Sequence, residues 1–421
     1  MEDITIIPHP KKILYIGYNY NSSYFLLGTD VGFQVHQSYP LALKFSRILN
    51  GGIGLVQVLN KSNIFCLVGG GESPKYAPNK LLIWDDKKGK EIYEFRFSSF
   101  VSNCFIKTKY IFVFCKDSIN IISMKTMKII KEIATKNNPE GIGTISSNKD
   151  KYILGWPNFN QGEIEVKDFF EIKNNIQSSK IKAHSNDICC IKINNDGTKI
   201  ASSSINGTII RIFDINKKKM IHEFKRGNGT AKIYSINFSE DNNLLAVTSD
   251  HAKAYIFLIN KEVKKALSSS NEEKKSVLQI NKKEENDNRE LKINLINEDK
   301  DSDENDDDEK EFNIKLENGK NNDNDENFEV INNELTKSDF TNKEQKSIFR
   351  GMSQIIGLSN IFQKGQHITF KIPTKKQSYI SFLNGQNNKP IVVDQLGNYT
   401  IAEITSDKEA KIIKRDLLID I

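Results

Sequence analysis

The chain has 421 residues, of which 38% are hydrophobic and 27% are charged, and its formal net charge is +6. No apolar run approaches the roughly 18–20 residues that a membrane-spanning helix needs, and the acidic N-terminus lacks a signal-peptide pattern. We therefore expect a cytoplasmic protein that reaches membranes only by peripheral recruitment. The five cysteines include no Cys-x-x-Cys pair, which predicts reduced thiols and neither a disulfide framework nor a zinc site.

The net charge is unevenly distributed along the chain. Residues 298–311 hold ten acidic residues and two lysines, so the rest of the chain carries a net charge of +14. A basic body suits an anionic partner, which is either a membrane surface or a nucleic acid. The nucleic-acid alternative lacks a basic stripe interleaved with aromatic residues, so we expect no nucleic-acid partner.

In chain order, the sequence consists of short β-strand candidates separated by turn residues. The candidates outside the repeat described next are KILYIGY, YFLLGT, NIFCLVGGG, KLLIWDD, YIFVFC, INIISM, YILGWP, ITFKI, PIVVDQ and YTIAEI. No long amphipathic helix intervenes between them. This pattern predicts an all-β fold and argues against an α/β fold.

Two consecutive units in the middle of the chain repeat one strand pattern. The first unit has strand candidates at 188–193, 199–204 and 208–215, and the second at 233–238, 244–249 and 252–259. The units are about 45 residues apart, and Phe213-Asp214 takes the place of the Trp-Asp dipeptide that closes a WD-repeat blade. Trp84-Asp85 takes the same place in an earlier unit. A period of about 40–45 residues predicts the blades of a β-propeller.

One long segment interrupts the strand pattern. Residues 261–346 are rich in Asn, Asp, Glu and Lys and contain almost no aromatic residues, so we expect a disordered insertion. Strand character resumes at His367, which places the insertion in the penultimate blade. The remaining residues, 1–260 and 347–421, are enough for seven blades of about 45 residues each. The predicted fold is therefore a single seven-bladed, WD-repeat-like β-propeller.

Several motifs resemble those of one family. They are Phe224-Lys225-Arg226-Gly227 followed by Ile233–Ser239, the glycine motifs at 51–54 and 69–71, Pro78–Asp86, Asn138-Pro139 and Ala183-His184. As a set they are similar to the motifs of the PROPPINs, seven-bladed propellers that bind polyphosphoinositides through a Phe-Arg-Arg-Gly motif. The similarity covers about residues 11–260 and 367–403.

The resemblance implies two headgroup sites. The residues of the first site are His184, Ser202, Ser204, Gly207, Thr208, Arg211 and Lys225. The residues of the second site are Arg226, Gly227, Ser249, Lys253 and Tyr255. Lys225 replaces an arginine of the family motif, Lys253 replaces a threonine and Tyr255 replaces a histidine. His184 has an alternative role as the structural histidine of a WD repeat.

The chemistry of the Lys225-Arg226 pair agrees with this assignment. Adjacent residues on a strand face opposite ways, so the two side chains can serve two pockets. A phosphomonoester carries a charge of about −1.5 to −2 and three acceptor oxygens. Arginine binds it through a two-pronged fork, whereas lysine acts as a point charge. We therefore expect the lysine to weaken the first site.

Residues 347–366 contain a candidate amphipathic membrane anchor. On a helical wheel its apolar side gathers Ile348, Phe349, Met352, Ile355, Ile356, Leu358 and Phe362. Such a helix can lie in the membrane interface with its apolar side buried. The alternative is that this segment packs against the rim of the propeller.

The sequence contains no catalytic constellation, so we expect a monomeric binding protein without catalytic residues, cofactor or metal. The resemblance implies an effector that docks edge-on to membranes through phosphatidylinositol 3-phosphate or 3,5-bisphosphate. It also implies recruitment to autophagic, endosomal or vacuolar membranes, with a lipid-transfer or conjugation-machinery protein of autophagy as partner. The alternative function is a protein-only WD-repeat scaffold.

Overall fold

The computed structural model describes residues 10–148, 151–174, 179–259, 367–405 and 409–418. All of them belong to one compact unit, formed by residues 1–267 and 352–421. The predicted insertion and the candidate anchor at 347–366 lie outside the described residues. No helix among the described residues is long and apolar enough to cross a membrane.

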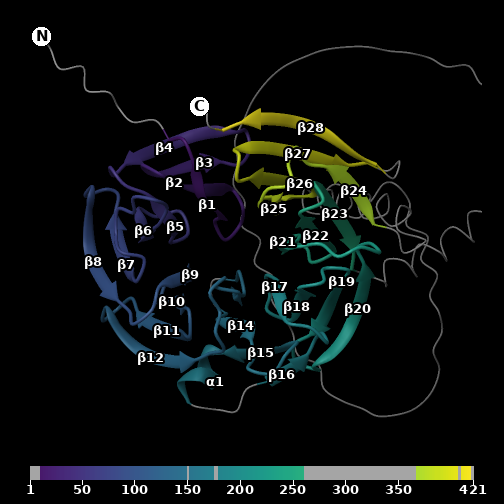
Figure 1. The fold of residues 1–421 in the computed structure, drawn as a ribbon, viewed down its shortest axis with the longest axis horizontal. Coiled ribbons are helices and arrows are strands. Elements are labelled where there is room, and N and C mark those ends of the chain that lie inside the picture. Colours follow the sequence, from purple (N-terminus) through teal and green to yellow (C-terminus); the bar gives the residue numbers. More distant parts are fainter. Residues whose placement is uncertain (1–9, 149–150, 175–178, 260–366, 406–408, 419–421) are drawn as a thin grey trace, which may run out of the picture. The chain divides into compact units, whose positions relative to one another are not determined.

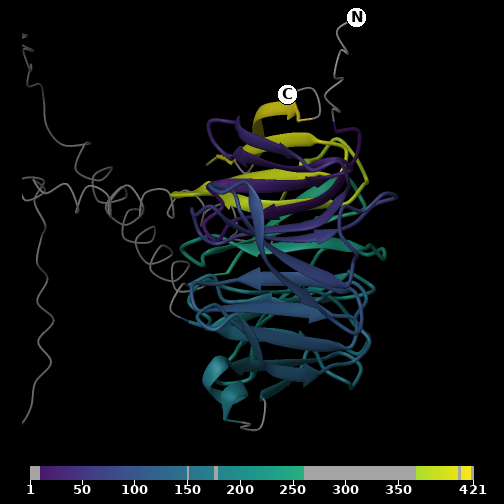
Figure 2. The same ribbon diagram turned by 90° about the vertical axis from the view of Figure 1, so that its left-hand side faces the viewer.

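Seven four-stranded antiparallel sheets follow one another around a ring (Figure 1), which confirms the predicted seven-bladed β-propeller. In each sheet the strands are neighbours in sequence order, so each blade is a meander whose first strand lies innermost. Figure 2 shows the same blades from the side.

The first four blades contain sixteen strands. Blade one is β1 (Ile13–Tyr18), β2 (Tyr24–Thr29), β3 (Gly32–Gln37) and β4 (Ala42–Ile48). Blade two is β5 (Ile53–Val58), β6 (Ile64–Gly69), β7 (Lys80–Asp85) and β8 (Lys90–Arg96). Blade three is β9 (Val101–Ile106), β10 (Tyr110–Cys115), β11 (Ser118–Ser123) and β12 (Lys128–Ala134). Blade four is β13 (Thr144–Ile145), β14 (Ile153–Pro157), β15 (Glu163–Asp168) and β16 (Ser179–Lys182), with α1 (Phe169–Lys173) before its last strand.

The last three blades complete the ring. Blade five is β17 (Ile188–Ile193), β18 (Lys199–Ser204), β19 (Ile209–Asp214) and β20 (Lys219–Lys225). Blade six is β21 (Ile233–Phe238), β22 (Leu244–Ser249), β23 (Lys253–Leu258) and β24 (Ile368–Lys371). Blade seven is β25 (Ser378–Leu383), β26 (Gln386–Asp394), β27 (Asn398–Ile404) and β28 (Ala410–Leu417).

The predicted repeat corresponds to blades five and six. Ile193 pairs with Ile200 in blade five, and Phe238 pairs with Leu245 at the same place in blade six. In blade six β23 pairs directly with β24, although more than a hundred residues separate them in sequence. The prediction that the long segment is an insertion in the penultimate blade is therefore confirmed.

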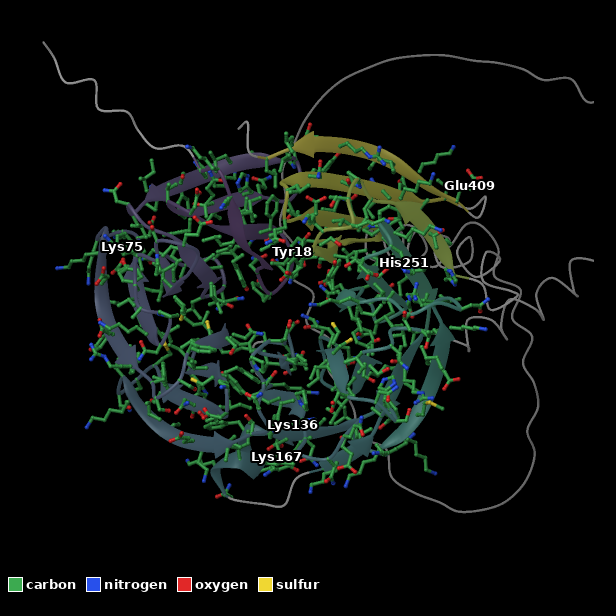
Figure 3. The ribbon with its side chains drawn as sticks, in the orientation of Figure 1. Tyr18, Lys75, Lys136, Lys167, His251 and Glu409 are labelled. Carbon is green, nitrogen blue, oxygen red and sulfur yellow. The ribbon has the colours of Figure 1, made fainter. Side chains whose placement is uncertain are left out.

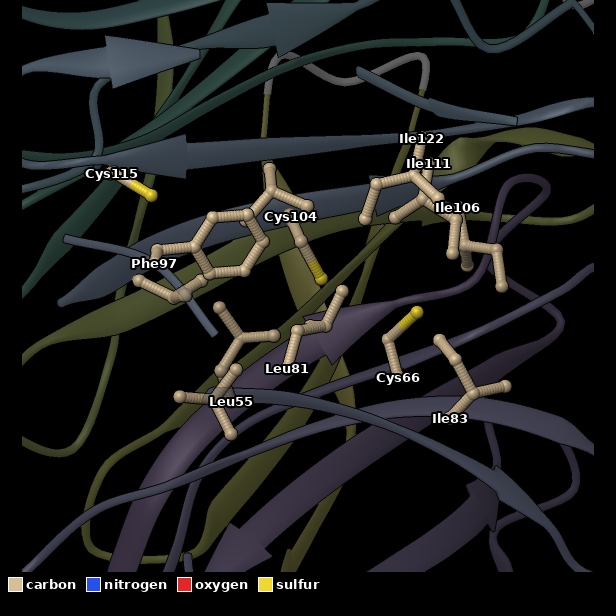
Figure 4. Close-up of a cluster of buried hydrophobic side chains, with 13 residues drawn as sticks. Leu55, Cys66, Leu81, Ile83, Phe97, Cys104, Ile106, Ile111, Cys115 and Ile122 are labelled. Atoms are coloured by element: carbon tan, nitrogen blue, oxygen red, sulfur yellow. The ribbon is translucent and has the colours of Figure 1, made fainter. Parts of the chain in front are cut away.

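The hydrophobic core is divided among the contacts between neighbouring blades. Figure 4 shows the cluster between blades two and three, where Leu55, Cys66 and Leu81 face Phe97 and Cys104. Period-two alternation supplies these side chains because each blade buries both of its faces against neighbours. The five cysteines are all free, as the sequence predicts.

The ring closes between blades seven and one by packing, because each of these blades supplies its own four strands. Apolar residues from both blades form one cluster, which includes Phe25, Leu27 and Tyr399. The Tyr18 hydroxyl donates to the carbonyl oxygen of Tyr379 over 3.3 Å, and the hydroxyls of Ser22 and Ser381 are 2.5 Å apart. Side-chain contacts therefore hold the first and last blades together.

Candidate functional site

The register of blade five brings the polar residues of the first predicted site into one row. Ser202 on β18 is the pairing partner of Arg211 on β19, and Arg211 is the partner of Glu223 on β20. Strand alternation then places Lys225, two residues after Glu223, on the same face of the sheet. The row crosses the blade from a buried serine to an exposed lysine at its outer edge.

His184, in the connection between blades four and five, lies against this row. Its Nε2 atom is 3.0 Å from the Ser202 hydroxyl, and only 6% of the residue is exposed. Burial, together with the nearby Arg211 cation, lowers the pKa of His184 to about 4. The imidazole is therefore neutral at pH 7, and it is available as a hydrogen-bonding group rather than as a cation.

Arg211 is already paired with an anion. Its Nε atom donates to Glu223 Oε2 over 2.8 Å, and one terminal nitrogen donates to the carbonyl oxygen of Ala183 over 2.7 Å. The second contact turns the guanidinium towards His184. A phosphate bound at this place would compete with the Glu223 carboxylate for the same cation.

Lys225 ends β20, and its side chain is exposed. The turn opposite its end includes Gly207 and Thr208, and the Thr208 carbonyl accepts a hydrogen bond from the Arg226 amide. Gly207 has φ +60°, and a Cβ at this position would lie 1.9 Å from the carbonyl oxygen of Ala231. Glycine is therefore required at position 207, and it allows the backbone conformation of the turn that frames the site.

Ser202, Ser203 and Ser204 are all buried, so exposure does not distinguish the two predicted site residues, Ser202 and Ser204, from Ser203. Ser202 contacts His184, whereas the carbonyl of Ser204 accepts a hydrogen bond from the Cys189 thiol. Of the two predicted serines, Ser202 is the one joined to the polar row.

Arg226 differs in environment from its neighbour Lys225. The sequence predicts that both residues bind a headgroup, but only 3% of Arg226 is exposed. Its Nε atom donates to the Gly207 carbonyl over 2.6 Å, and a terminal nitrogen donates to the Gly229 carbonyl over 2.5 Å. The guanidinium thus ties the Gly207 turn to the loop that follows β20.

The other terminal nitrogen of Arg226 leads to the second predicted site. It is 3.3 Å from the Tyr255 hydroxyl and 3.2 Å from Nδ1 of His251, a residue of the turn between β22 and β23 that Figure 3 labels. The guanidinium also lies over the Tyr255 ring, 5.6 Å from its centroid. Tyr255 therefore fills the family's histidine position as a partner of Arg226.

The remaining residues of the second site surround this contact. Ser249 is buried, and its hydroxyl accepts from the His251 amide over 3.4 Å. Lys253 is exposed at the start of β23, and Gly227 has open space around its Cα. His367 lies beside Tyr255, with 5.3 Å between the ring centroids. Burial lowers the pKa of His367, and the cations Arg226 and Lys253 add to that effect.

Sequence reasoning missed three residues of these sites: Glu223, His251 and His367. Strand alternation could have identified Glu223, because it precedes Lys225 by two positions and faces the same way. His251 lies two residues beyond Ser249 in a predicted turn, which is a weak signal. No local signal identifies His367, because the long insertion separates it from its spatial neighbours.

Chemically, both sites suit a multivalent anion and lack the features of a catalytic centre among the described residues. Each combines two cations with other hydrogen-bonding side chains: Lys225 and Arg211 with His184, and Arg226 and Lys253 with His251 and Tyr255. No group of three or more potential metal ligands occurs in the described part of the chain. The described side chains therefore favour anion recognition.

Comparison with known proteins gives the same family as the sequence motifs. The family described as PROPPIN matches residues 53–277. SVP1-like protein 2 of Pichia angusta is 34% identical over 253 residues, which cover 59% of this chain and 70% of that protein. Autophagy-related protein 18e of Arabidopsis thaliana is 30% identical over 255 residues, or 60% of this chain and 66% of that protein.

Solved structures share the fold at low sequence identity. Hsv2 of Kluyveromyces lactis superposes with a TM-score of 0.64 and 18% identity, covering 98% of this chain and all of the other. A structure described as a complex of KlAtg21 with the coiled-coil of AgAtg16 gives a TM-score of 0.62 and 17% identity, with 97% and 99% covered.

Proposed function

Because the chain belongs to the PROPPIN family, we propose that it is a non-catalytic effector that binds phosphatidylinositol 3-phosphate or 3,5-bisphosphate. It docks edge-on, so that the rim of blades five and six faces the membrane. The two headgroup sites are those built around Lys225 with Arg211, and around Arg226 with Lys253.

The row in blade five is the single observation that carries this proposal. Ser202 and Arg211 are pairing partners, His184 bonds to Ser202, and Lys225 is exposed on the same face of the sheet. A phosphomonoester needs about two positive charges and several donors. Lys225 and Arg211 supply the charges, whereas His184 and Ser202 supply neutral donors.

The two cations of the first site have different tasks. Lys225 is exposed at the rim, so it makes the first electrostatic contact with an anionic membrane. Arg211 lies deeper, and it changes partner from Glu223 to the phosphate when the headgroup enters. This exchange lowers the free energy that is gained on headgroup binding, because the Arg211–Glu223 ion pair is lost as the Arg211–phosphate pair forms.

Membrane attachment and partner binding are further parts of the proposal. Residues 347–366 add an apolar anchor to the headgroup contacts, and the acidic run at 298–311 opposes close approach to an anionic leaflet. The protein is recruited from the cytoplasm to autophagic or endosomal membranes. A solved relative is described in complex with a coiled-coil of AgAtg16, which supports a partner from the autophagy machinery.

Liposome flotation tests the proposal. The full-length chain is mixed with vesicles made of neutral lipid and one anionic lipid. That lipid is either a 3-phosphoinositide or enough phosphatidylserine to give the same charge. We expect it to float only with the former and to lose flotation when Lys225 becomes Thr. Equal flotation on both vesicles means nonspecific charge attraction, and no flotation on either favours the protein-only scaffold.

A further inference from the structure

A channel runs along the axis of the propeller, where the innermost strands of the blades meet. Its volume is about 440 Å³, and its lining comes from innermost strands and the loops next to them. This volume lies in the range of sites for small molecules. Neither predicted headgroup site lies in this channel, because its lining includes neither Lys225 nor Arg226.

Three polar side chains lie at one level of the channel. Gln57, Lys192 and Asn237 are each the last-but-one residue of an innermost strand, and all three line the channel. Each pairs with the third residue of the next strand in its blade, which is Cys66, Ala201 or Ala246. Equal register in equivalent blades sets the three side chains at the same height.

Lys192 is a cation without a counter-ion among the described residues. No described carboxylate lies within ion-pair distance of its amine, and burial lowers its pKa. Burying an unpaired charge costs free energy, which an anion placed beside it would offset. The position of this half-buried amine in the channel and its lack of a described counter-ion together point to a bound anion.

The neighbouring groups are donors that suit the same ligand. The Gln57 amide donates to the Tyr15 hydroxyl, which leaves the second Gln57 hydrogen and the Tyr15 hydrogen for a ligand. Asn237 donates to the Ser381 hydroxyl over 2.9 Å. These groups come from blades one, two and six, so a ligand between them and Lys192 would bridge the channel.

The charged groups elsewhere in the lining already have partners. Lys107 donates to the carbonyls of Ser146 and Asn148, each over 2.6 Å. Glu140 lies 3.8 Å from the amine of Lys232, and the Glu240 carboxylate accepts from the Gly385 amide over 3.3 Å. Lys192 is therefore the cation in the lining that a ligand can address without breaking a described contact.

We propose that the central channel binds a small phosphate- or carboxylate-bearing molecule on the Lys192 amine, with the Gln57 amide and Tyr15 hydroxyl as neutral donors. The ligand class follows from the donors: one cation and two neutral N–H or O–H groups match an oxyanion. The ligand bridges innermost strands of blades one, two and five, so it also joins blade five to two blades on the other side of the ring (Figure 1).

Calorimetric titration of the full-length chain with inorganic phosphate and, separately, with citrate tests the proposal. We expect at least one of the two to bind, and Lys192→Met to weaken that binding at least about tenfold, since a charge-assisted contact is lost. Lys219→Met, an exposed change on the outer strand of the same blade, is the matched control and changes affinity by less than about twofold. Equal binding by parent and Lys192→Met overturns the proposal, as does no binding of either anion.

Lys225→Met separates the channel from the rim. Binding that survives Lys192→Met but disappears in Lys225→Met places the anion at the headgroup site and overturns the proposal. A second readout covers a Lys192→Met chain that does not fold. Acetic anhydride acylates Lys192 in the parent chain, and peptide mass spectrometry follows the rate. Bound phosphate or citrate should slow acylation at Lys192 at least about threefold and leave Lys219 unchanged; an unchanged rate at Lys192 contradicts the proposal.

Discussion

Arg211 Nε and Glu223 Oε2 lie 2.8 Å apart, so the deeper cation of the first headgroup site is held by a carboxylate from the neighbouring strand. The pair keeps Arg211 in place in the absence of ligand. It also makes Glu223 a competitor of the phosphate, which lowers the affinity of the site for a headgroup.

Glu223→Gln should therefore strengthen headgroup binding. The amide keeps the shape of the side chain but removes the negative charge that opposes the ligand. Partly exposed ion pairs contribute about 0–1 kcal/mol, so we expect about a two- to fivefold higher affinity for the soluble headgroup by calorimetry. Glu94→Gln is the matched control, because Glu94 pairs with Lys80 over 2.8 Å in the equivalent strands of blade two. Weaker binding by Glu223→Gln than by Glu94→Gln would show that the carboxylate positions Arg211 for the ligand.

Lys225→Arg should also strengthen binding, because a guanidinium fork replaces a point charge at an exposed position. Lys225→Thr should abolish flotation on 3-phosphoinositide vesicles and change the free energy of unfolding by no more than about 0.5 kcal/mol. Vesicle flotation and urea denaturation of the same preparations measure the two effects. Weaker binding by the arginine variant would mean that the pocket is shaped around an ammonium group.

Arg226→Thr should behave differently from the change next to it. Loss of the Arg226 guanidinium leaves the buried Gly207 carbonyl without its side-chain donor and removes the hydrogen bond to Gly229. We therefore expect the free energy of unfolding to fall by about 1–3 kcal/mol. Denaturation of Lys225→Thr serves as the reference. An Arg226→Thr chain as stable as Lys225→Thr would show that the guanidinium contacts add nothing to the fold.

Acid should destabilise the chain through His184. Its folded-state pKa is about 4, below the ordinary value of 6.5, so the unfolded chain binds the proton first as the pH falls. The contribution of His184 to the free energy of unfolding is thus fully present above pH 6.5, and it is lost as the pH falls to about 4. Between pH 7 and 5 we expect His184 to contribute about 1–2 kcal/mol of the loss. Urea denaturation of the parent and of His184→Gln at both pH values measures it, and parallel losses in the two chains would contradict this role.

The sequence was sufficient to predict the fold and the location of blades five and six, because both depend on local patterns. Ile193 and Phe238 take equivalent places in the two blades. Their strands are set by strand alternation and by the turn residues between the strands, which neighbouring residues determine. The insertion was predictable from composition, and β23 pairing with β24 follows once it is set aside.

The side-chain environments in the sites were less predictable. The motif placed Lys225 and Arg226 side by side, but it did not reveal that one is exposed and the other buried under Gly207 and Gly229. That difference arises where β20 ends and the chain turns inward, which depends on contacts with a separate blade. His367 could not be predicted from the sequence for the same reason, because only the pairing of β23 with β24 brings it next to Tyr255.

Equilibrium binding to vesicles tests the central claim most directly. The parent chain and Lys225→Thr are titrated with vesicles that contain phosphatidylinositol 3-phosphate and with charge-matched phosphatidylserine vesicles, at constant salt because the contacts are electrostatic. We predict that the parent binds the first vesicles at least about tenfold more tightly than the second, and that Lys225→Thr loses this preference. Equal affinity of the parent for both vesicles, or an unchanged preference in Lys225→Thr, would contradict phosphoinositide recognition by the blade-five site.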